Sequence, residues 1–112
     1  MACVPVASGV NPPLRGHVYR VDLGHGLKPW VVVSNNVRNR NLDSIIAARV
    51  TTTGKNVHLD TVVSLSAADP LVGFVLCDDL VPLYREELSH LMGALSPDTM
   101  RRVSAGLRVA LP

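Results

Sequence analysis

The sequence predicts a mostly β fold with helices (α+β), in which a small barrel is followed by a C-terminal amphipathic helix. Two observations carry this prediction. Short β-branched runs separated by turn residues fill most of the chain, and the apolar spacing becomes helical near the C-terminus. With 112 residues, 47% of them hydrophobic and 18% charged, the chain suffices for one core. We expect residues 1–14, which contain three prolines, to form a flexible N-terminal tail and residues 15–112 to form a single domain.

The first strand is predicted at residues 17–23, where apolar and polar side chains alternate as in a half-buried strand. Tyr19, Val21 and Leu23 lie on the side that we expect to face the core. A glycine-rich turn then leads to a continuous apolar run at residues 30–33. That run predicts a buried central strand, paired with the first one as a hairpin.

The middle of the chain predicts further strands. Residues 36–41 form a polar segment with two arginines, which we interpret as a loop or a short helical turn, and residues 44–50 predict a third strand. Shorter strands are expected at residues 57–59, 62–65 and 73–77, with a turn at Asp69-Pro70.

The last third of the chain changes period. Ser96 is an N-cap followed by Pro97 at the first helical position, and apolar residues then recur at helical spacing: Met100, Val103, Leu107 and Leu111. These features predict the C-terminal amphipathic helix. Between residues 84 and 95 two interpretations stay open. Residues 85–88 fit a helical turn, and residues 91–95 fit either a strand or the continuation of that helical turn.

The charge is distributed unevenly. Residues 1–55 carry seven Lys or Arg and two Asp, a net charge of +5, whereas residues 56–112 carry four basic and seven acidic side chains, a net charge of −3. A basic first half suits contact with a polyanion, although an ordinary solvated surface has the same composition.

Composition also argues against several classes of protein. Only 4% of the residues are aromatic, which disfavours a large cofactor cavity, so we expect no cofactor. The two cysteines and four histidines show no metal-ligand spacing, so we expect no metal site. No run approaches 18 apolar residues and no signal peptide is evident, so we expect a cytoplasmic protein without a membrane partner.

Three segments carry polar groups where a small barrel would expose a site. A glycine-rich turn delivers Lys28 to the start of a strand, threonines follow Arg49, and Asp78 and Asp79 follow a strand that ends at Cys77. Taken alone, each has a simpler reading: a solvated hairpin, strand-favouring threonines, and an acidic turn. We expect Cys77 to be a buried thiol.

Together these segments form an ordered set of motifs. They are Leu14-Arg15-Gly16-His17-Val18-Tyr19-Arg20-Val21-Asp22-Leu23, then Lys28-Pro29-Trp30-Val31-Val32-Val33-Ser34-Asn35, then residues 45–53 with Val50-Thr51-Thr52, then residues 73–78, and last Gly93-Ala94-Leu95-Ser96-Pro97 with the final helix. The set resembles the MazF/PemK/Kid toxins, which are sequence-specific endoribonucleases (mRNA interferases) of bacterial toxin–antitoxin pairs. The resemblance runs from about Arg15 to Leu111 and is strongest to mycobacterial and other actinobacterial members.

The resemblance implies an SH3-like barrel that forms a homodimer and binds a cognate MazE-like antitoxin. It also implies metal-independent cleavage of single-stranded RNA, whether mRNA, tRNA or rRNA. The ribose 2′-hydroxyl would attack its own phosphate and leave 2′,3′-cyclic phosphate and 5′-hydroxyl ends. Such cleavage inhibits translation and growth.

The resemblance carries three catalytic positions onto this sequence. Lys28 takes the place of the family's catalytic arginine, Thr51 that of its phosphate-contacting threonine, and Asp78 that of an aspartate that some members use. Lysine is a point charge, so a bidentate clamp on the phosphate is lost at this position. A glutamate of the first loop in many relatives is also absent here, and Leu76 replaces an arginine of some relatives.

Polar residues next to these positions are expected to contact RNA. Amides and guanidinium groups hydrogen-bond the bases and phosphates of unpaired RNA, and hydroxyls reach phosphate oxygens. The expected RNA-binding residues are His25, Asn36, Arg38, Arg40, Thr52 and Thr53. His25 is also a candidate for the acid or base.

Two other functions remain open at this point. A non-catalytic toxin on the same fold, such as the gyrase poison CcdB, would act through the surface of its C-terminal helix and would not need Lys28 paired with Thr51. An inactive RNA-binding relative is compatible with the lysine and the missing glutamate.

Overall fold

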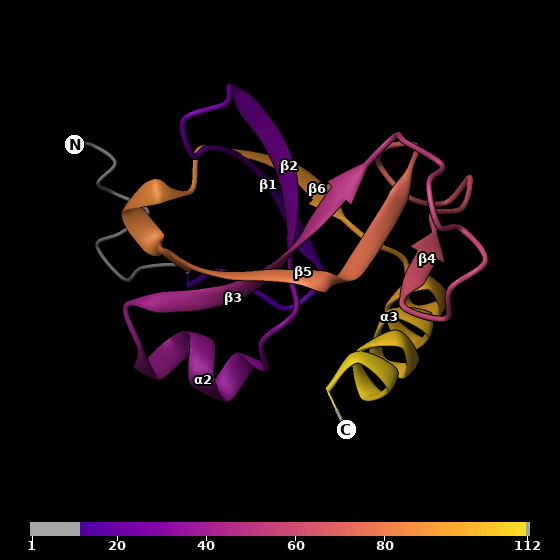
Figure 1. The fold of residues 1–112 in the computed structure, drawn as a ribbon. Coiled ribbons are helices and arrows are strands. Elements are labelled where there is room, and N and C mark those ends of the chain that lie inside the picture. The colour runs from indigo at the N-terminus through magenta and orange to yellow at the C-terminus, as the bar shows by residue number, and fades with distance from the viewer. Residues whose placement is uncertain (1–11, 112) are drawn as a thin grey trace.

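The residues that the structure describes form one six-stranded antiparallel sheet with two α-helices, an α+β fold as predicted (Figure 1). The computed structural model describes residues 12–111. The strands are β1 (His17–Asp22), β2 (Leu27–Val32), β3 (Ser44–Thr51), β4 (Val62–Ser64), β5 (Phe74–Tyr84) and β6 (His90–Ala94). The helices are α2 (Asn36–Asn41), a 3-10 turn at Arg85–Glu87, and α3 (Pro97–Ala110). The strand order in the sheet is β4-β5-β3-β2-β1-β6.

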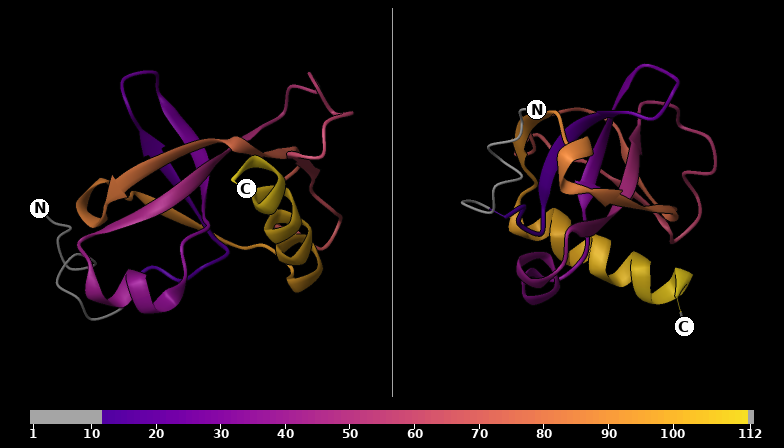
Figure 2. Two further views of the ribbon diagram at one scale, coloured as in Figure 1. Left: turned by 60° about the horizontal axis from the view of Figure 1, so that its bottom comes forward. Right: turned by 90° about the vertical axis from the view of Figure 1, so that its left-hand side faces the viewer.

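The sheet is strongly curved (Figure 2), which brings its two edge regions together. The loop that follows β4 holds the end of β6, because the Asp69 carboxylate accepts a hydrogen bond from the backbone N–H of Ser96 at 2.7 Å. Pro70 packs so closely on Gly93 of β6 that a Cβ there would lie 3.0 Å from the proline ring. The curled sheet therefore approaches the small barrel that the sequence predicts.

Two apolar cores lie on opposite faces of this sheet. One packs β2, β3 and β5 against α3 and contains Val31, Val50, Val75 and Val103. The other lies on the opposite face; its members are Tyr19, Val21, Trp30, Val32, Ile45, Ala47, Leu83 and Leu88. Successive residues of β2 alternate between the two cores, so the run at 30–33 is buried on both faces, as predicted.

Strand β1 is buried on the side that was predicted to face the core. Tyr19 and Val21 are buried in the second core, whereas Arg20 and Asp22 on the opposite side are exposed. Val18, near the start of the strand, is the exception on that side, because it is buried in the core against α3. Leu23, expected in the core, follows the end of the strand and is 41% exposed.

Helix α3 begins as predicted. The Ser96 side chain accepts a hydrogen bond from the Thr99 N–H, Pro97 opens the helix, and Met100 and Val103 are buried. Leu111, the last residue of the predicted apolar stripe, lies at the C-cap and is 60% exposed.

One of the shorter predicted strands, at residues 57–59, differs from the structure. Residues 57–59 form turns with Val57 and Leu59 exposed, so the predicted strand there is wrong. Asn56 has a φ of 59°, and turn hydrogen bonds replace the pairing that a strand requires. Of the open readings between residues 84 and 95, the structure has a 3-10 turn followed by strand β6.

Strand β5 is longer than predicted and contains a bulge. It continues to Tyr84, and its pairing with β3 moves from Ala48↔Leu80 to Arg49↔Leu76. Residues 77–79 are therefore extra on β5 and lie in mid-strand, where the sequence predicted an acidic turn after the strand. Cys77 is fully buried, as predicted, and burial together with neighbouring Asp78 raises the pKa of its thiol to about 11.

The predicted tail lies mostly outside the described residues. Within residues 12–14, Pro13 is fully buried. None of the helices in residues 12–111 is long and apolar enough to cross a membrane.

Candidate nucleic-acid interface

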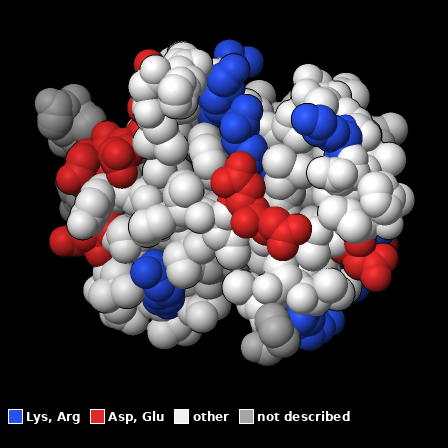
Figure 3. Space-filling view, in the orientation of Figure 1, with Lys and Arg blue, Asp and Glu red and all other residues white. Residues whose placement is uncertain are grey.

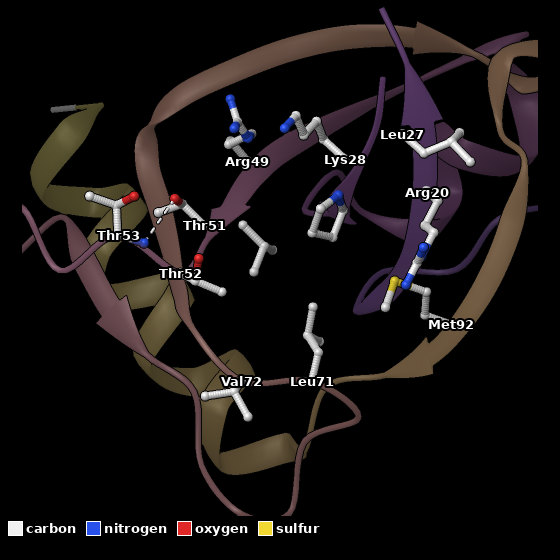
Figure 4. A pocket seen from close by; sticks show the side chains of 12 residues that line it. Arg20, Leu27, Lys28, Arg49, Thr51, Thr52, Thr53, Leu71, Val72 and Met92 are labelled. Atoms are coloured by element: carbon white, nitrogen blue, oxygen red, sulfur yellow. Dashed lines mark hydrogen bonds between the residues drawn. The ribbon is translucent and has the colours of Figure 1, made fainter. Parts of the chain in front are cut away.

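Lys28 and Thr51 line one groove of about 450 Å³ (Figure 4). Side chains from the facing ends of β2 and β3 form one wall, and Leu71, Val72 and Met92 lie across from them. The complete lining is Arg20, Leu27, Lys28, Pro29, Arg49, Val50, Thr51, Thr52, Thr53, Leu71, Val72 and Met92. Thr52 and Thr53, predicted to bind RNA, therefore line the same groove as two of the three predicted catalytic residues, Lys28 and Thr51.

Strand pairing explains why Lys28 and Thr51 meet. Trp30 of β2 is paired with Arg49 of β3. Because side chains alternate along a strand, Lys28 lies on the same face as Trp30, and Thr51 lies on the same face as Arg49. The two residues continue the paired position on the same face, although they are 23 positions apart in sequence.

The threonines form a tight turn at the end of β3. The Thr51 hydroxyl accepts a hydrogen bond from the Thr53 N–H at 3.1 Å (Figure 4). Thr51 is half-buried, whereas Thr52 and Thr53 are exposed. Thr51 is thus fixed by its neighbour, and two further hydroxyls stand beside it.

The positive charges of the groove are not neutralised within the protein. In residues 12–111 the ion pairs are those of Asp98 with Arg101 and Arg102, so no carboxylate lies within 4.0 Å of Lys28 or Arg49. Figure 4 shows the ends of these two side chains pointing toward one another. A groove of this kind attracts anionic ligands such as phosphate.

Asp78 lies beside this groove and not in it. It lines a second hollow of about 320 Å³, which shares Thr51 and Thr53 with the first. The Asp78 carboxylate accepts a hydrogen bond from the buried Thr61 hydroxyl. Figure 3 shows acidic atoms next to basic atoms near the centre of this view, so the surface there carries charges of both signs.

His25 lies on the other side of Lys28, in the turn between β1 and β2. The Asp22 carboxylate holds that turn by accepting hydrogen bonds from the backbone N–H groups of Gly24 and Gly26. His25 lines a small hollow of about 260 Å³ that also contains Lys28 and Arg49. The structure thus places His25 next to the predicted catalytic lysine.

Asn36, Arg38 and Arg40 are not brought to the groove. They lie on α2 and line none of the three hollows around Lys28 and Thr51. The Arg38 guanidinium donates to the Ser44 carbonyl at 2.8 Å, and the Asn36 side chain accepts from the Arg15 N–H at 2.7 Å. Their RNA-binding role stays a prediction for a separate surface, and the basic charge of the first half is divided between that surface and the groove.

Two charged residues of the groove were not predicted as site residues, Arg20 and Arg49. For Arg49 the available signal was the period of two from Arg49 to Thr51, which puts both side chains on one face of a strand. Within residues 12–111 there is no group of three or more metal-ligating side chains.

Fold and groove together define a small α+β protein with a groove lined by cations that have no carboxylate partner among residues 12–111. The sequence pattern of the PemK-like, MazF-like toxins of type II toxin–antitoxin systems matches residues 14–111. The chain belongs to this family of toxins, as the sequence motifs suggested.

Relatives of known structure and name agree with this assignment. Endoribonuclease MazF4 of Mycobacterium tuberculosis is 44% identical over 102 residues, which cover 91% of this chain and 95% of that protein. A mycobacterial endoribonuclease solved in complex with its cognate antitoxin is 44% identical, with a TM-score of 0.84 over 89% of this chain and 97% of that one. MazF in a MazE–MazF structure from Deinococcus radiodurans shares the fold, with a TM-score of 0.76 over 90% of this chain and 96% of that one, at 24% identity.

Proposed function

We propose that this chain is the endoribonuclease toxin of a toxin–antitoxin pair and that it cleaves single-stranded RNA in the groove between Lys28 and Thr51. The observation that carries the proposal is the convergence of a lysine and three threonines on one groove whose cations have no carboxylate partner. The mycobacterial endoribonucleases that are 44% identical support the same activity.

The proposed reaction is a transesterification within the RNA. The 2′-oxygen forms a bond to the adjacent phosphorus, and the bond from phosphorus to the 5′-oxygen breaks. A 2′,3′-cyclic phosphate and a 5′-hydroxyl result. The 2′-hydroxyl gives up one proton, and the leaving oxygen takes up one. Negative charge grows on the non-bridging oxygens, so donors aimed at them lower the barrier.

Each groove residue has a role in this reaction. The Lys28 ammonium stabilises the non-bridging oxygens, Thr51 orients one of them, and Thr52 and Thr53 hold the neighbouring backbone. Asp78, across the shared wall, accepts the proton of the 2′-hydroxyl or positions the site, and His25 is the nearby donor for the leaving oxygen. No step of this scheme requires a metal ion.

The proposed partners follow from the same groove. A MazE-like antitoxin would cover it with an extended acidic segment, which competes with RNA for Lys28 and its neighbours. A mycobacterial relative has been solved with its cognate antitoxin, which supports this partnership. A homodimer of this chain in the cytoplasm would supply a longer RNA-binding surface than one copy.

Cleavage in EDTA tests the proposal. The purified protein is incubated with a long single-stranded RNA, the fragments are resolved, and their ends are identified by enzymatic labelling. We expect discrete fragments with 5′-hydroxyl ends, and a loss of about 100- to 1,000-fold in kcat for Lys28→Ala, the loss typical of a removed transition-state donor.

Arg101→Ala is the matched control, since Arg101 is an exposed cation on α3 outside the groove. It should cleave like the parent protein. Intact RNA in EDTA would contradict the metal-independent scheme, and equal activity of Lys28→Ala would remove Lys28 from it. A gyrase poison or an inactive RNA binder would leave RNA intact under all conditions.

A further inference from the structure

Arg49 is a cation of the groove to which the proposed reaction assigns no role. Lys28 is a point charge without a planar fork of donors, whereas a guanidinium presents paired donors in one plane that match two phosphate oxygens. We propose that Arg49 supplies this planar donor pair and binds the non-bridging oxygens of the phosphate that Lys28 contacts. The inference rests on the proposed function, since it assigns the second cation of the same site.

The register of the sheet brings Arg49 to Lys28. Arg49 is paired directly with Trp30, so Lys28, two residues before Trp30, is its diagonal neighbour on the same face. Diagonal neighbours in a sheet are about 7–8 Å apart at the backbone, within reach of long side chains. Both residues line the main groove and also the small hollow of His25, so one phosphate group can meet both cations.

The hydrogen-bonding capacity of Arg49 is unused. Residues 12–111 contain five half-buried arginines, namely Arg15, Arg38, Arg49, Arg85 and Arg102. Four of them donate to acceptors in the protein, such as the carbonyls of Val33, Ser44, Asn39 and Ser64. Arg49 alone has no such acceptor in the described part of the chain, and its Nε is buried without a partner. The terminal nitrogens of Arg49 also have no acceptor among the described residues, so their donors are free to bind an anion in the groove.

The guanidinium of Arg49 lies beside the ring of Trp30. The central carbon of the Arg49 guanidinium lies 6.0 Å from the centroid of the Trp30 ring, at the limit of a cation–π contact. Trp30 is itself buried in the second core, so the ring cannot turn away. The buried ring therefore forms one fixed side of the space that the Arg49 side chain occupies next to Lys28.

A set of four variants tests the proposal by cleavage kinetics. Arg49→Ala and Arg49→Gln should each lower kcat by about 100-fold or more with a smaller change in KM, because the contact strengthens as charge develops. Arg49→Lys should remain well below the parent, since it restores charge without the planar donors. Adding Lys28→Arg to Arg49→Lys exchanges the two cations and should recover about tenfold or more over Arg49→Lys alone. Circular dichroism confirms that each variant is folded.

A binding measurement separates this inference from the proposed activity. A short mixed-sequence single-stranded DNA has no 2′-hydroxyl and cannot be cleaved, and its affinity is measured by fluorescence anisotropy over a salt series. Each lost phosphate contact lowers the slope of log affinity against log salt by about 0.7 for single strands. We expect this change for Arg49→Gln and none for Arg101→Ala.

The outcomes are distinct. If the parent cleaves RNA and folded Arg49→Gln keeps both kcat and the salt slope, Arg49 only packs on Trp30 and the inference is wrong, whereas the proposed function stands. If the parent binds DNA but never cleaves RNA, the proposed activity fails, and the lower slope of Arg49→Gln still supports the phosphate contact. Failure of Lys28→Arg to raise the activity of Arg49→Lys overturns the claim that one planar group is needed at this phosphate.

Discussion

Gly73 shows how much the turn formed by Thr51, Thr52 and Thr53 depends on a single position. The backbone of Gly73 has a φ of 143° and lies against the end of β3, where a Cβ would be 2.4 Å from the carbonyl oxygen of Thr51. Only a residue without a side chain allows this approach. The backbone of Thr51 and Thr52 is thus packed directly against Gly73.

Replacing this glycine should therefore damage both stability and cleavage. We expect Gly73→Ala to lower the free energy of unfolding by at least about 2 kcal/mol, because backbone strain and a steric clash add together. Urea denaturation measures the loss. Gly24→Ala is the control, since Gly24 also has a positive φ but a Cβ there meets nothing within 4 Å, and it should cost about 1 kcal/mol. Equal losses for the two variants would show that the clash relaxes without cost.

At the scale of elements, one carboxylate joins the β4–β5 connection to helix α3. Asp69 accepts hydrogen bonds from Ser66, from the Ser96 N–H and from the Thr99 hydroxyl. Desolvation by burial raises the pKa of this carboxyl, but the hydrogen bonds outweigh it and lower the pKa to about 2. The junction that closes the curled sheet is therefore held by an ionised group.

The pH dependence of stability should report this junction. The pKa of Asp69 is lower in the folded than in the unfolded state, where it is near 3.8, so the folded state is stabilised by the ionised carboxylate. The stabilisation is complete above about pH 5 and is lost as the pH falls through 3.8 toward 2. Asp69→Asn should destabilise the protein by about 1–3 kcal/mol at pH 7 and should reduce the loss of stability in this acid range. Thermal denaturation from pH 7 to pH 2 checks both expectations, and an unchanged acid profile in the variant would contradict them.

At the scale of the whole molecule, the burial of Cys77 against α3 indicates that the sheet and α3 unfold as one unit. Its side chain lies between β5 and α3, and a Cβ on Gly106 would lie 2.8 Å from its sulfur. A raised pKa of about 11 also keeps the thiol protonated at neutral pH.

Labelling of Cys77 should consequently require global unfolding. We expect its alkylation at pH 8, followed by mass spectrometry of the peptide, to be slower by several orders of magnitude than in urea-unfolded protein, in line with the free energy of unfolding. Labelling in native buffer at the rate of the unfolded chain would show that α3 detaches locally.

The sequence predicted those elements whose signals are local. The run from Trp30 to Val33 is buried on both faces and so reads as a strand in any context, and Ser96-Pro97 caps a helix by its own hydrogen bonds. Val57 and Leu59 misled because two exposed apolar residues in a turn look like a strand. The length of β5 was missed because the polar pair after Cys77 interrupts its pattern.

The candidate site could be predicted only at the positions where the sequence matches a motif of the toxin family. Lys28 and Thr51 followed from the resemblance to the toxin family, and the groove that they share agrees with that pairing. Arg49 was not predicted as a site residue, because its position beside Lys28 depends on the register Trp30↔Arg49, which sequence spacing does not determine. Helix α2 carries its basic residues elsewhere for the same reason: only the fold decides which charges share a surface.

The bulge in β5 separates the acidic residues beside the groove from the paired framework of the sheet. Residues 77–79 have no counterpart on β3, and the paired segments on either side of them are each held by their own ladder of hydrogen bonds. Cys77 is fixed by the core, but Asp78 and Asp79 are exposed, and exchanging either side chain would leave both ladders aligned. The charge beside the groove is therefore set independently of the framework that carries Lys28 and Thr51.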